Sequence, residues 1–287
     1  MYAMTEAEIR AKIDELARNE IRISYGKPEN PLSVTASRIG GRPAVPADFV
    51  WPEYTGEGYD DVTKSRPLSF LAQINLSDIA EYDTEGLLPK TGILSFFYEY
   101  ISSCWGFDPA DKGCSRVYYF PETDVLTLAE TPEEMDEEAV IPEHEVKFEQ
   151  QISVPDPSCI SHDIDYDEYW ECSAEMGYEP DEWGDVTKLL GYPDVIQNPM
   201  ENECERVTRG YRCGSPEDYA KIPESEKADS LEKAKDWTLL FQMGTIETDD
   251  GHYEMMFGDC GHIYFWIKKS DLQSLNFDNV WLILQCG

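Results

Sequence analysis

Two stretches of this chain carry the same strand pattern at the same spacing. Residues 68–76 and 237–243 are apolar runs that are each interrupted by one glutamine, and a second apolar run follows each of them after a turn. Short apolar runs bounded by turn residues predict buried strands. The matched positions, all 169 residues apart, are Leu71 and Leu240, Gln73 and Gln242, Gly92 and Gly261, and Phe96 and Phe265. Agreement at several positions with one offset indicates an internal duplication.

The duplication sets the expected fold. Two copies are too few for a solenoid, so we expect them to share one core. We predict an α+β, mostly β fold, in which the duplicated strand module forms a pseudo-symmetric sheet or barrel core. We also predict one domain over residues 1–287, with repeats at about 66–120 and 236–287 and an acidic insert at about 121–185. An N-terminal helix precedes them, because Thr5 and Glu8 have the spacing of a capping box.

Three segments outside the repeats have their own patterns. Alternation over 146–154 predicts a strand, and the polar stretch 225–235 predicts a helix. Residues 185–190 are followed by Gly191, which suits the C-terminal cap of a helix. We therefore predict a short helix over 185–190.

The acidic charge restricts the partners of the chain. The formal net charge is −35, and residues 122–185 hold 22 Asp and Glu against one Lys, Lys147. Such a field repels nucleic acid and anionic membranes and attracts cationic partners. We predict a basic protein as the partner, and neither nucleic acid nor a membrane. The alternative is a solvated acidic face that aids solubility.

The N-terminus and the cysteines indicate the compartment. The first ten residues hold Glu6 and Glu8 and no apolar core of a signal peptide. No apolar run approaches the roughly 20 residues of a membrane helix. The eight cysteines include no C-x-x-C pair, and disulfide-rich proteins are usually small and secreted. We expect reduced thiols and a cytoplasmic location.

An ordered set of motifs resembles the YwqG-like family of bacterial domains of unknown function. The motifs are GGRP at 40–43, WP at 51–52, LAQI at 71–74, GILSFF at 92–97, LGYP at 190–193, LFQ at 240–242, FGDCG at 257–261, FWI at 265–267 and FDNVW at 277–281. The resemblance implies a mostly-β α+β fold in the bacterial cytoplasm and no established activity. It also implies, for some members, an immunity or accessory role.

Five polar residues are candidates for a ligand cleft between the repeats. The set consists of Arg38, Arg42, Gln73, Gln242 and Asp259. Two arginines around a Gly-Gly turn can hold an anion, although they can equally pair with the abundant carboxylates. A glutamine inside an apolar strand must be hydrogen-bonded, and its simplest role is to fix a nearby loop. Asp259 lies in a glycine-rich turn, where it can be structural or can bind a cation.

Aromatic residues interleaved with acids form a second candidate site, for protein docking. These residues are Tyr166, Tyr169, Trp170, Tyr178 and Trp183. Aromatic anchors among acids suit a basic partner, or else the insert folds onto the core.

We predict no metal and no cofactor, since the four histidines lack zinc-ligand spacing. We identify no catalytic residue, because Cys260 and His262 have no recognisable third partner. The first hypothesis is thus a protein-binding module that captures a basic partner. The alternative is a small-ligand binder or enzyme with an inter-repeat cleft.

Overall fold

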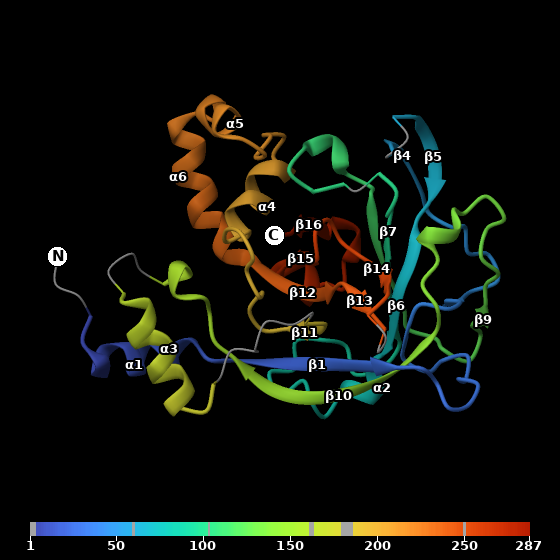
Figure 1. Ribbon diagram of the computed structural model, residues 1–287, viewed down its shortest axis with the longest axis horizontal. Coiled ribbons are helices and arrows are strands. Elements are labelled where there is room, and N and C mark those ends of the chain that lie inside the picture. The colour runs from blue at the N-terminus through green and yellow to red at the C-terminus, as the bar shows by residue number, and fades with distance from the viewer. Residues whose placement is uncertain (1–3, 59–60, 103, 161–163, 179–185, 249–250) are drawn as a thin grey trace.

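The computed structural model describes residues 4–287 apart from 59–60, 103, 161–163, 179–185 and 249–250 (Figure 1). Its main feature is one sheet of ten antiparallel strands. In spatial order these are β16 (Trp281–Gln285), β15 (His262–Lys268), β12 (Trp237–Gly244), β11 (Lys188–Leu190), β1 (Arg18–Gly26), β10 (His144–Ser153), β2 (Arg38–Ile39), β6 (Ser69–Asn75), β7 (Ile93–Tyr98) and β8 (Ser115–Phe120). The α+β, mostly β class is confirmed.

Short hairpins and helices surround this sheet. The two-stranded pairs are β3 (Ala44–Val45) with β9 (Thr127–Leu128), β4 (Glu53–Glu57) with β5 (Thr63–Pro67), and β13 (Ile246–Glu247) with β14 (Tyr253–Met255). The α-helices are α1 (Glu6–Leu16), α2 (Leu76–Ile79), α3 (Tyr166–Glu175), α4 (Glu201–Thr208), α5 (Pro216–Lys221), α6 (Glu224–Lys233) and α7 (Lys269–Gln273). Single 3₁₀ turns lie at Pro109–Asp111, Glu137–Ala139, Pro157–Cys159, Ala234–Asp236 and Phe277–Asn279. Among the helices in this part of the chain, none is long and apolar enough to cross a membrane.

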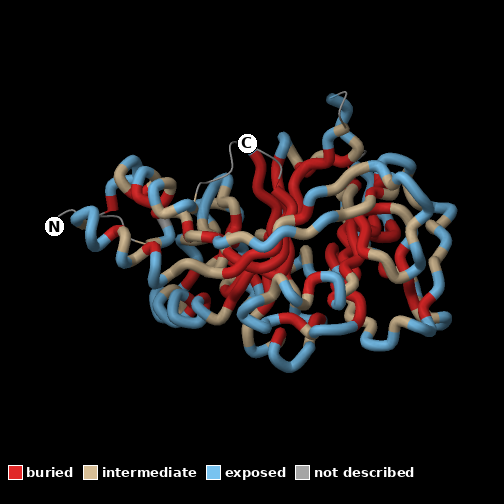
Figure 2. The backbone as a smooth tube through the Cα atoms, turned by 90° about the horizontal axis from the view of Figure 1, so that it is seen from below, coloured by how far each residue is buried: buried red, intermediate tan, exposed pale blue. Residues whose placement is uncertain are grey.

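The sheet curls until its two ends face each other across one core. The ring of Phe96 on β7 lies 4.4 Å from that of Phe241 on β12 and 5.3 Å from that of Phe265 on β15, measured between centroids. Figure 2 shows the buried residues gathered in the interior of the molecule, with exposed segments around them. Strands β6 and β12 are buried on both faces, which explains their nearly continuous apolar sequences.

Different segments cover the outer faces of the two ends. Cys204 and Val207 of helix α4, with Met200 directly before it, pack against the tryptophans of β12, β15 and β16. At the other end, Phe49 and Trp51 of a loop cover Phe97. The predicted N-terminal helix is α1, with Thr5 N donating to Glu8 Oε2 at 2.8 Å. It packs on α3 in a separate lobe at the left of Figure 1.

The two ends of the sheet contain the same contacts at equivalent positions. Strands β6 and β12 both have a register irregularity at the matched leucine, opposite β7 and β15 respectively. The backbone N–H of Ala44 donates to Gln73 Oε1 at 2.8 Å, and that of Asp194 donates to Gln242 Oε1 at 2.9 Å. Two such sets are what an internal duplication would leave, and the duplication stays our proposal. The predicted insert is part of this sheet, because β10 pairs with β1 over nine residues.

The predicted helix at 185–190 is wrong. Residues 188–190 form β11, which pairs Lys188 with Gln242 on one side and with Arg22 on the other. Pairing along both edges decides the conformation of a segment whose local pattern fits a helix equally well. Gly191 follows with φ of +70°, and a Cβ there would lie 2.7 Å from the Glu20 Cβ. The glycine thus allows the chain to turn closely beside β1.

Candidate functional site

A cavity of about 800 Å³ lies against β11, and we call it the β11 cavity. Its wall comes from β1, the end of β10, α3, the loop after β11, the β13–β14 hairpin and the start of β15. The residues are Glu20, Arg22, Ile152, Ser153, Val154, Asp156, Trp170, Tyr178, Val186, Lys188, Tyr192, Pro193, Asp194, Val195, Ile196, Glu247, Tyr253, Asp259, Cys260, His262 and Gly287. The cavity therefore joins segments from the whole length of the chain.

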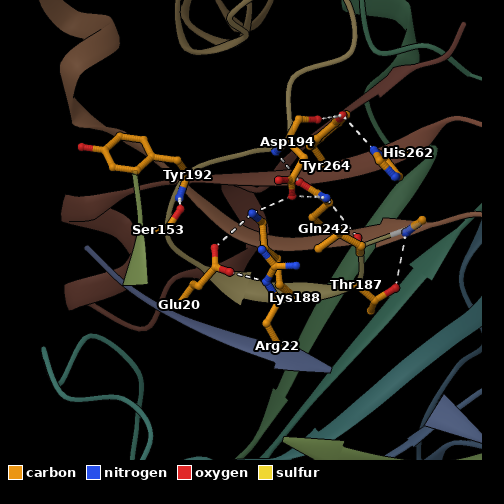
Figure 3. A network of polar contacts seen from close by, with 12 residues as sticks. Glu20, Arg22, Ser153, Thr187, Lys188, Tyr192, Asp194, Gln242, His262 and Tyr264 are labelled. Carbon is orange, nitrogen blue, oxygen red and sulfur yellow. Dashed lines mark hydrogen bonds and ion pairs between the residues drawn. The ribbon is translucent and has the colours of Figure 1, made fainter. Parts of the chain in front are cut away.

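The floor of the β11 cavity is an ion-paired lysine. The ammonium of Lys188 lies 3.0 Å from Glu20 Oε2 and 2.6 Å from Asp194 Oδ2, and its side chain is 2% exposed (Figure 3). Glu20 also pairs with Arg22 on the same strand. Removing charges from water is costly unless they are closely paired. These four side chains, which we call the Lys188 network, meet that requirement with two cations and two carboxylates.

Asp194 is held in place by strands β12 and β15. Gln242 Nε2 donates to Asp194 Oδ2 at 2.8 Å and to the Val186 carbonyl at 3.0 Å. Tyr264 Oη donates to the Asp194 carbonyl at 2.6 Å. Burial would raise the pKa of Asp194, but the Lys188 ammonium, the Arg22 guanidinium and the hydrogen bond from Gln242 together outweigh it, and the pKa is lowered. Asp194 is thus an ionised and fixed acceptor at neutral pH.

His262 lies beside this network, on the cavity wall. Its Nδ1 lies 3.3 Å from Tyr264 Oη. Burial lowers the pKa of His262 from its ordinary value of 6.5, against the opposing influence of the Asp194 carboxylate. The ring is therefore neutral at pH 7. The wall is polar at this point without adding positive charge.

The rim of the β11 cavity combines acids with aromatic rings. Its carboxylates are those of Asp156, Glu247 and Asp259, and its aromatic residues are Trp170, Tyr178, Tyr192 and Tyr253. The guanidinium of Arg18 already lies over the Tyr192 ring, 4.3 Å from the centroid. Cys260, with φ of +48°, contacts Tyr253 Oη through its sulfur at 3.5 Å. Carboxylates and ring faces together attract organic cations.

The predicted cleft residues divide between the two ends of the sheet. Asp259 lies on the rim of the β11 cavity, and Gln242 holds Asp194 beneath it. Arg38 and Gln73 are paired across β2 and β6 at the other end. Gln73 Nε2 donates to the carbonyls of Val34 and Ala36, so it fixes a loop. Arg42 pairs with Glu130 at the surface. The structure thus places two of the five beside this cavity and three at the opposite end.

The predicted docking residues also occupy different environments. Tyr169 is buried, and its Oη donates to the Pro155 carbonyl at 2.7 Å. Tyr166 is 47% exposed on α3. Trp170 and Tyr178 line the β11 cavity. Trp183 lies outside the described residues. Two aromatics of this set therefore belong to the wall of the cavity.

Sequence reasoning missed Glu20, Lys188 and Asp194. One signal was present, since Lys188, Gly191 and Pro193 repeat Arg38, Gly41 and Pro43 at a spacing of 150 residues. The predicted helix at 185–190 hid this second match. Glu20 had no signal of its own, because nothing in the sequence shows that β1 lies beside β11. In the described ranges, no three His, Cys, Asp or Glu side chains are grouped so as to hold a metal ion.

Comparison with known families assigns the chain. Residues 37–286 match the family described as Domain of unknown function (DUF1963), and the chain belongs to that family. The match covers both ends of the sheet and most of the β11 cavity. A comparison with curated proteins finds no match.

Proposed function

We propose that the protein is a binding module that captures a basic polypeptide, with a cationic side chain of that partner seated in the β11 cavity. The observation that carries the proposal is the rim, where three carboxylates and four aromatic rings surround an open space of about 800 Å³. An immunity or accessory protein of the bacterial cytoplasm, as the family resemblance implies, is one setting for such capture.

The charges around the cavity support a cationic ligand. The Lys188 network on the floor is neutral as a group, and the rim carries three carboxylates against the one guanidinium of Arg18. The net charge of −35 adds a long-range field that steers a basic partner toward the protein. Within the cavity, the aromatic faces favour a cation that has lost part of its water. The acids thus attract the partner, and the rings select a site.

The test is binding of a fluorescently labelled arginine-rich peptide, followed by anisotropy at low and moderate salt. Tyr253→Leu keeps apolar bulk on the rim but removes a ring that is 50% exposed. We expect it to weaken binding roughly 2- to 30-fold, the range of a cation–π contact. The matched control is Tyr166→Leu, since Tyr166 is similarly exposed but does not line the cavity.

A second pair of variants separates the cavity from the general field. Asp259→Asn removes a rim carboxylate, and Glu134→Gln removes an exposed carboxylate elsewhere. The proposal predicts a larger loss for Asp259→Asn. Equal losses in both pairs would mean that the overall charge binds the peptide and would contradict a role for the cavity.

The alternative ligand is a small organic cation, which the same assay distinguishes. Arginine amide added in excess should compete with the peptide only weakly, because it lacks the partner's other contacts with the acidic surface. Tight, saturable binding of arginine amide alone would instead favour a small-ligand binder.

A further inference from the structure

Two cysteine side chains meet beneath the loop that joins β7 to β8. Cys104 lies in that loop, and Cys114 comes directly before β8. Both are buried and free, and the Cys114 thiol is hydrogen-bonded to that of Cys104. The pair is distinct from the β11 cavity, whose wall contains neither residue.

Two hydrogen bonds tie the cysteine backbones to the end of β7. Tyr98 Oη donates to the Cys104 carbonyl at 3.0 Å. The backbone N–H of Glu99 donates to the Cys114 carbonyl at 2.7 Å. Asp111 closes the loop between the two cysteines, because its Oδ2 accepts the Gly106 N–H at 2.9 Å and its carbonyl accepts the Cys114 N–H at 3.0 Å. A disulfide requires neighbouring backbones and side chains in contact, and the closed loop with the thiol–thiol contact points to such a pair.

Each cysteine also lines a cavity. Cys104 lines a space of about 610 Å³ together with Tyr54 and Trp105. Cys114 lines a separate space of about 560 Å³. The hydrogen bond from Cys104 and burial raise the pKa of Cys114 well above its ordinary value of 9.0. Cys114 is therefore protonated at neutral pH. Cys104 is 7% exposed against 2% for Cys114, so an oxidant entering the cavity beside Cys104 reaches this residue first.

We propose that Cys104 and Cys114 form a reversible disulfide and that this pair is a redox modification site. With a small disulfide as oxidant, the Cys104 sulfur attacks one sulfur of the reagent and releases the other half as a thiol. The Cys114 sulfur, after losing its proton, attacks Cys104 in the mixed disulfide and releases the second thiol. Two protein thiols are oxidised to one disulfide, and one reagent disulfide is reduced to two thiols.

The position of the loop gives this bond a structural consequence. The loop leaves β7, which pairs with the edge strand β8, and crosses to the other edge strand, β16. There the Trp105 carbonyl accepts the Leu284 N–H at 3.0 Å, and the Gly106 carbonyl accepts Trp281 Nε1 at 2.8 Å. A Cβ at Gly106 would lie 1.8 Å from the Leu282 carbonyl oxygen, so the approach is close. The disulfide would lock the segment that bridges the two edges of the curled sheet.

The experiment is oxidation of the native protein with oxidised glutathione, followed by alkylation of remaining thiols, digestion with trypsin without reduction, and mass spectrometry. Cleavage after Lys112 separates the two cysteines into peptides 91–112 and 113–116. We expect these peptides to be joined by a disulfide that dithiothreitol removes. We also expect the oxidised protein to melt roughly 5 °C higher than the reduced protein.

The controls are Cys260→Ser, which removes an exposed thiol and should leave the linked peptides unchanged, and Cys104→Ser, which should abolish them. Because the peptide mapping uses the wild-type chain, it does not depend on the folding of a variant. Alkylation of both thiols after native oxidation would overturn the proposal. A link that forms only in urea, or that joins either cysteine to a different partner, would overturn it as well.

Discussion

The two ends of the curled sheet share one pattern of hydrogen bonds but differ in the groups that surround the basic residue. In both, a basic residue on a short strand lies opposite a glutamine, namely Arg38 with Gln73 and Lys188 with Gln242. Arg38 donates to the carbonyls of Ser33, Val34 and Ala36 and pairs with Glu143, so loop backbone surrounds it. Lys188 has two carboxylates as its partners and faces the β11 cavity.

A difference in residue type at one pair of matched positions accounts for much of this contrast. Ala44 occupies the position, 150 residues earlier, that Asp194 occupies at the other end. Both donate their N–H to the matched glutamine, but only Asp194 adds a carboxylate to the basic residue. At the first end, loop carbonyls therefore surround the basic residue, and at the second an ionic floor lies beneath the β11 cavity. The hydrogen bonds of the glutamine are shared, and the partners of the basic residue differ.

The largest expected effect is on stability and comes from Lys188. Lys188→Met leaves the Glu20 and Asp194 carboxylates without their ammonium, and we expect a loss of about 3–5 kcal/mol in the free energy of unfolding. Arg38→Met should cost less, roughly 1–3 kcal/mol, because the Glu143 side chain is 32% exposed and can turn to water. Urea denaturation measures both. A larger loss in the free energy of unfolding for Arg38→Met than for Lys188→Met would contradict this difference between the two ends.

The matched glutamines should have equal effects on stability and unequal effects on binding. Gln73→Ala and Gln242→Ala each remove three hydrogen bonds from a buried site, and we expect about 2 kcal/mol for each. Only Gln242→Ala releases Asp194, so only this variant should weaken binding of the arginine-rich peptide. Equal peptide affinities for the two variants would show that the cavity is not the binding site.

A smaller effect concerns helix α4, which covers the outer face of the sheet at the end that carries the β11 cavity. Burial raises the pKa of Glu203 to about 7, against the hydrogen bond from Tyr219. Because the folded protein favours the protonated carboxyl, Glu203 destabilises it progressively as the pH rises from about 4.5 to 7. Glu203→Gln should therefore be roughly 1–2 kcal/mol more stable than wild type at pH 8 and equal to it at pH 4.5. The difference in melting temperature across this pH range measures the effect, and a constant difference would contradict it.

Sequence patterns predicted the parts of this fold that are determined by residues close together in the chain. The apolar runs around Gln73 and Gln242 gave the paired strands β6 and β12, and the Thr5–Glu8 spacing gave the start of α1. The same patterns failed at β11, which is three residues long and is defined by its neighbours on both sides. Since Lys188 lies on β11, the sequence patterns did not predict the floor of the cavity either.

The site depends on contacts between residues far apart in the chain, and this limits prediction from one sequence. Glu20 and Lys188 are 168 positions apart and meet because β1 pairs with β11. Asp259 was a candidate from its glycine-rich turn alone, and its place on the rim follows from the β13–β14 hairpin and the start of β15 nearby. Residue type suggested Asp259, and only the fold supplied its neighbours.

An exchange of charge between the two ends tests the central claim most directly. Lys90, which is exposed, lies 169 positions before Asp259, at the matched place in the first repeat. The double variant Asp259→Lys with Lys90→Asp keeps the net charge of −35 but reverses the charge at position 259, so that the rim has two carboxylates and one ammonium in place of three carboxylates. We expect it to bind the arginine-rich peptide roughly tenfold more weakly than wild type, with unchanged thermal stability. Wild-type affinity in this double variant would show that overall charge, and not the β11 cavity, captures the ligand.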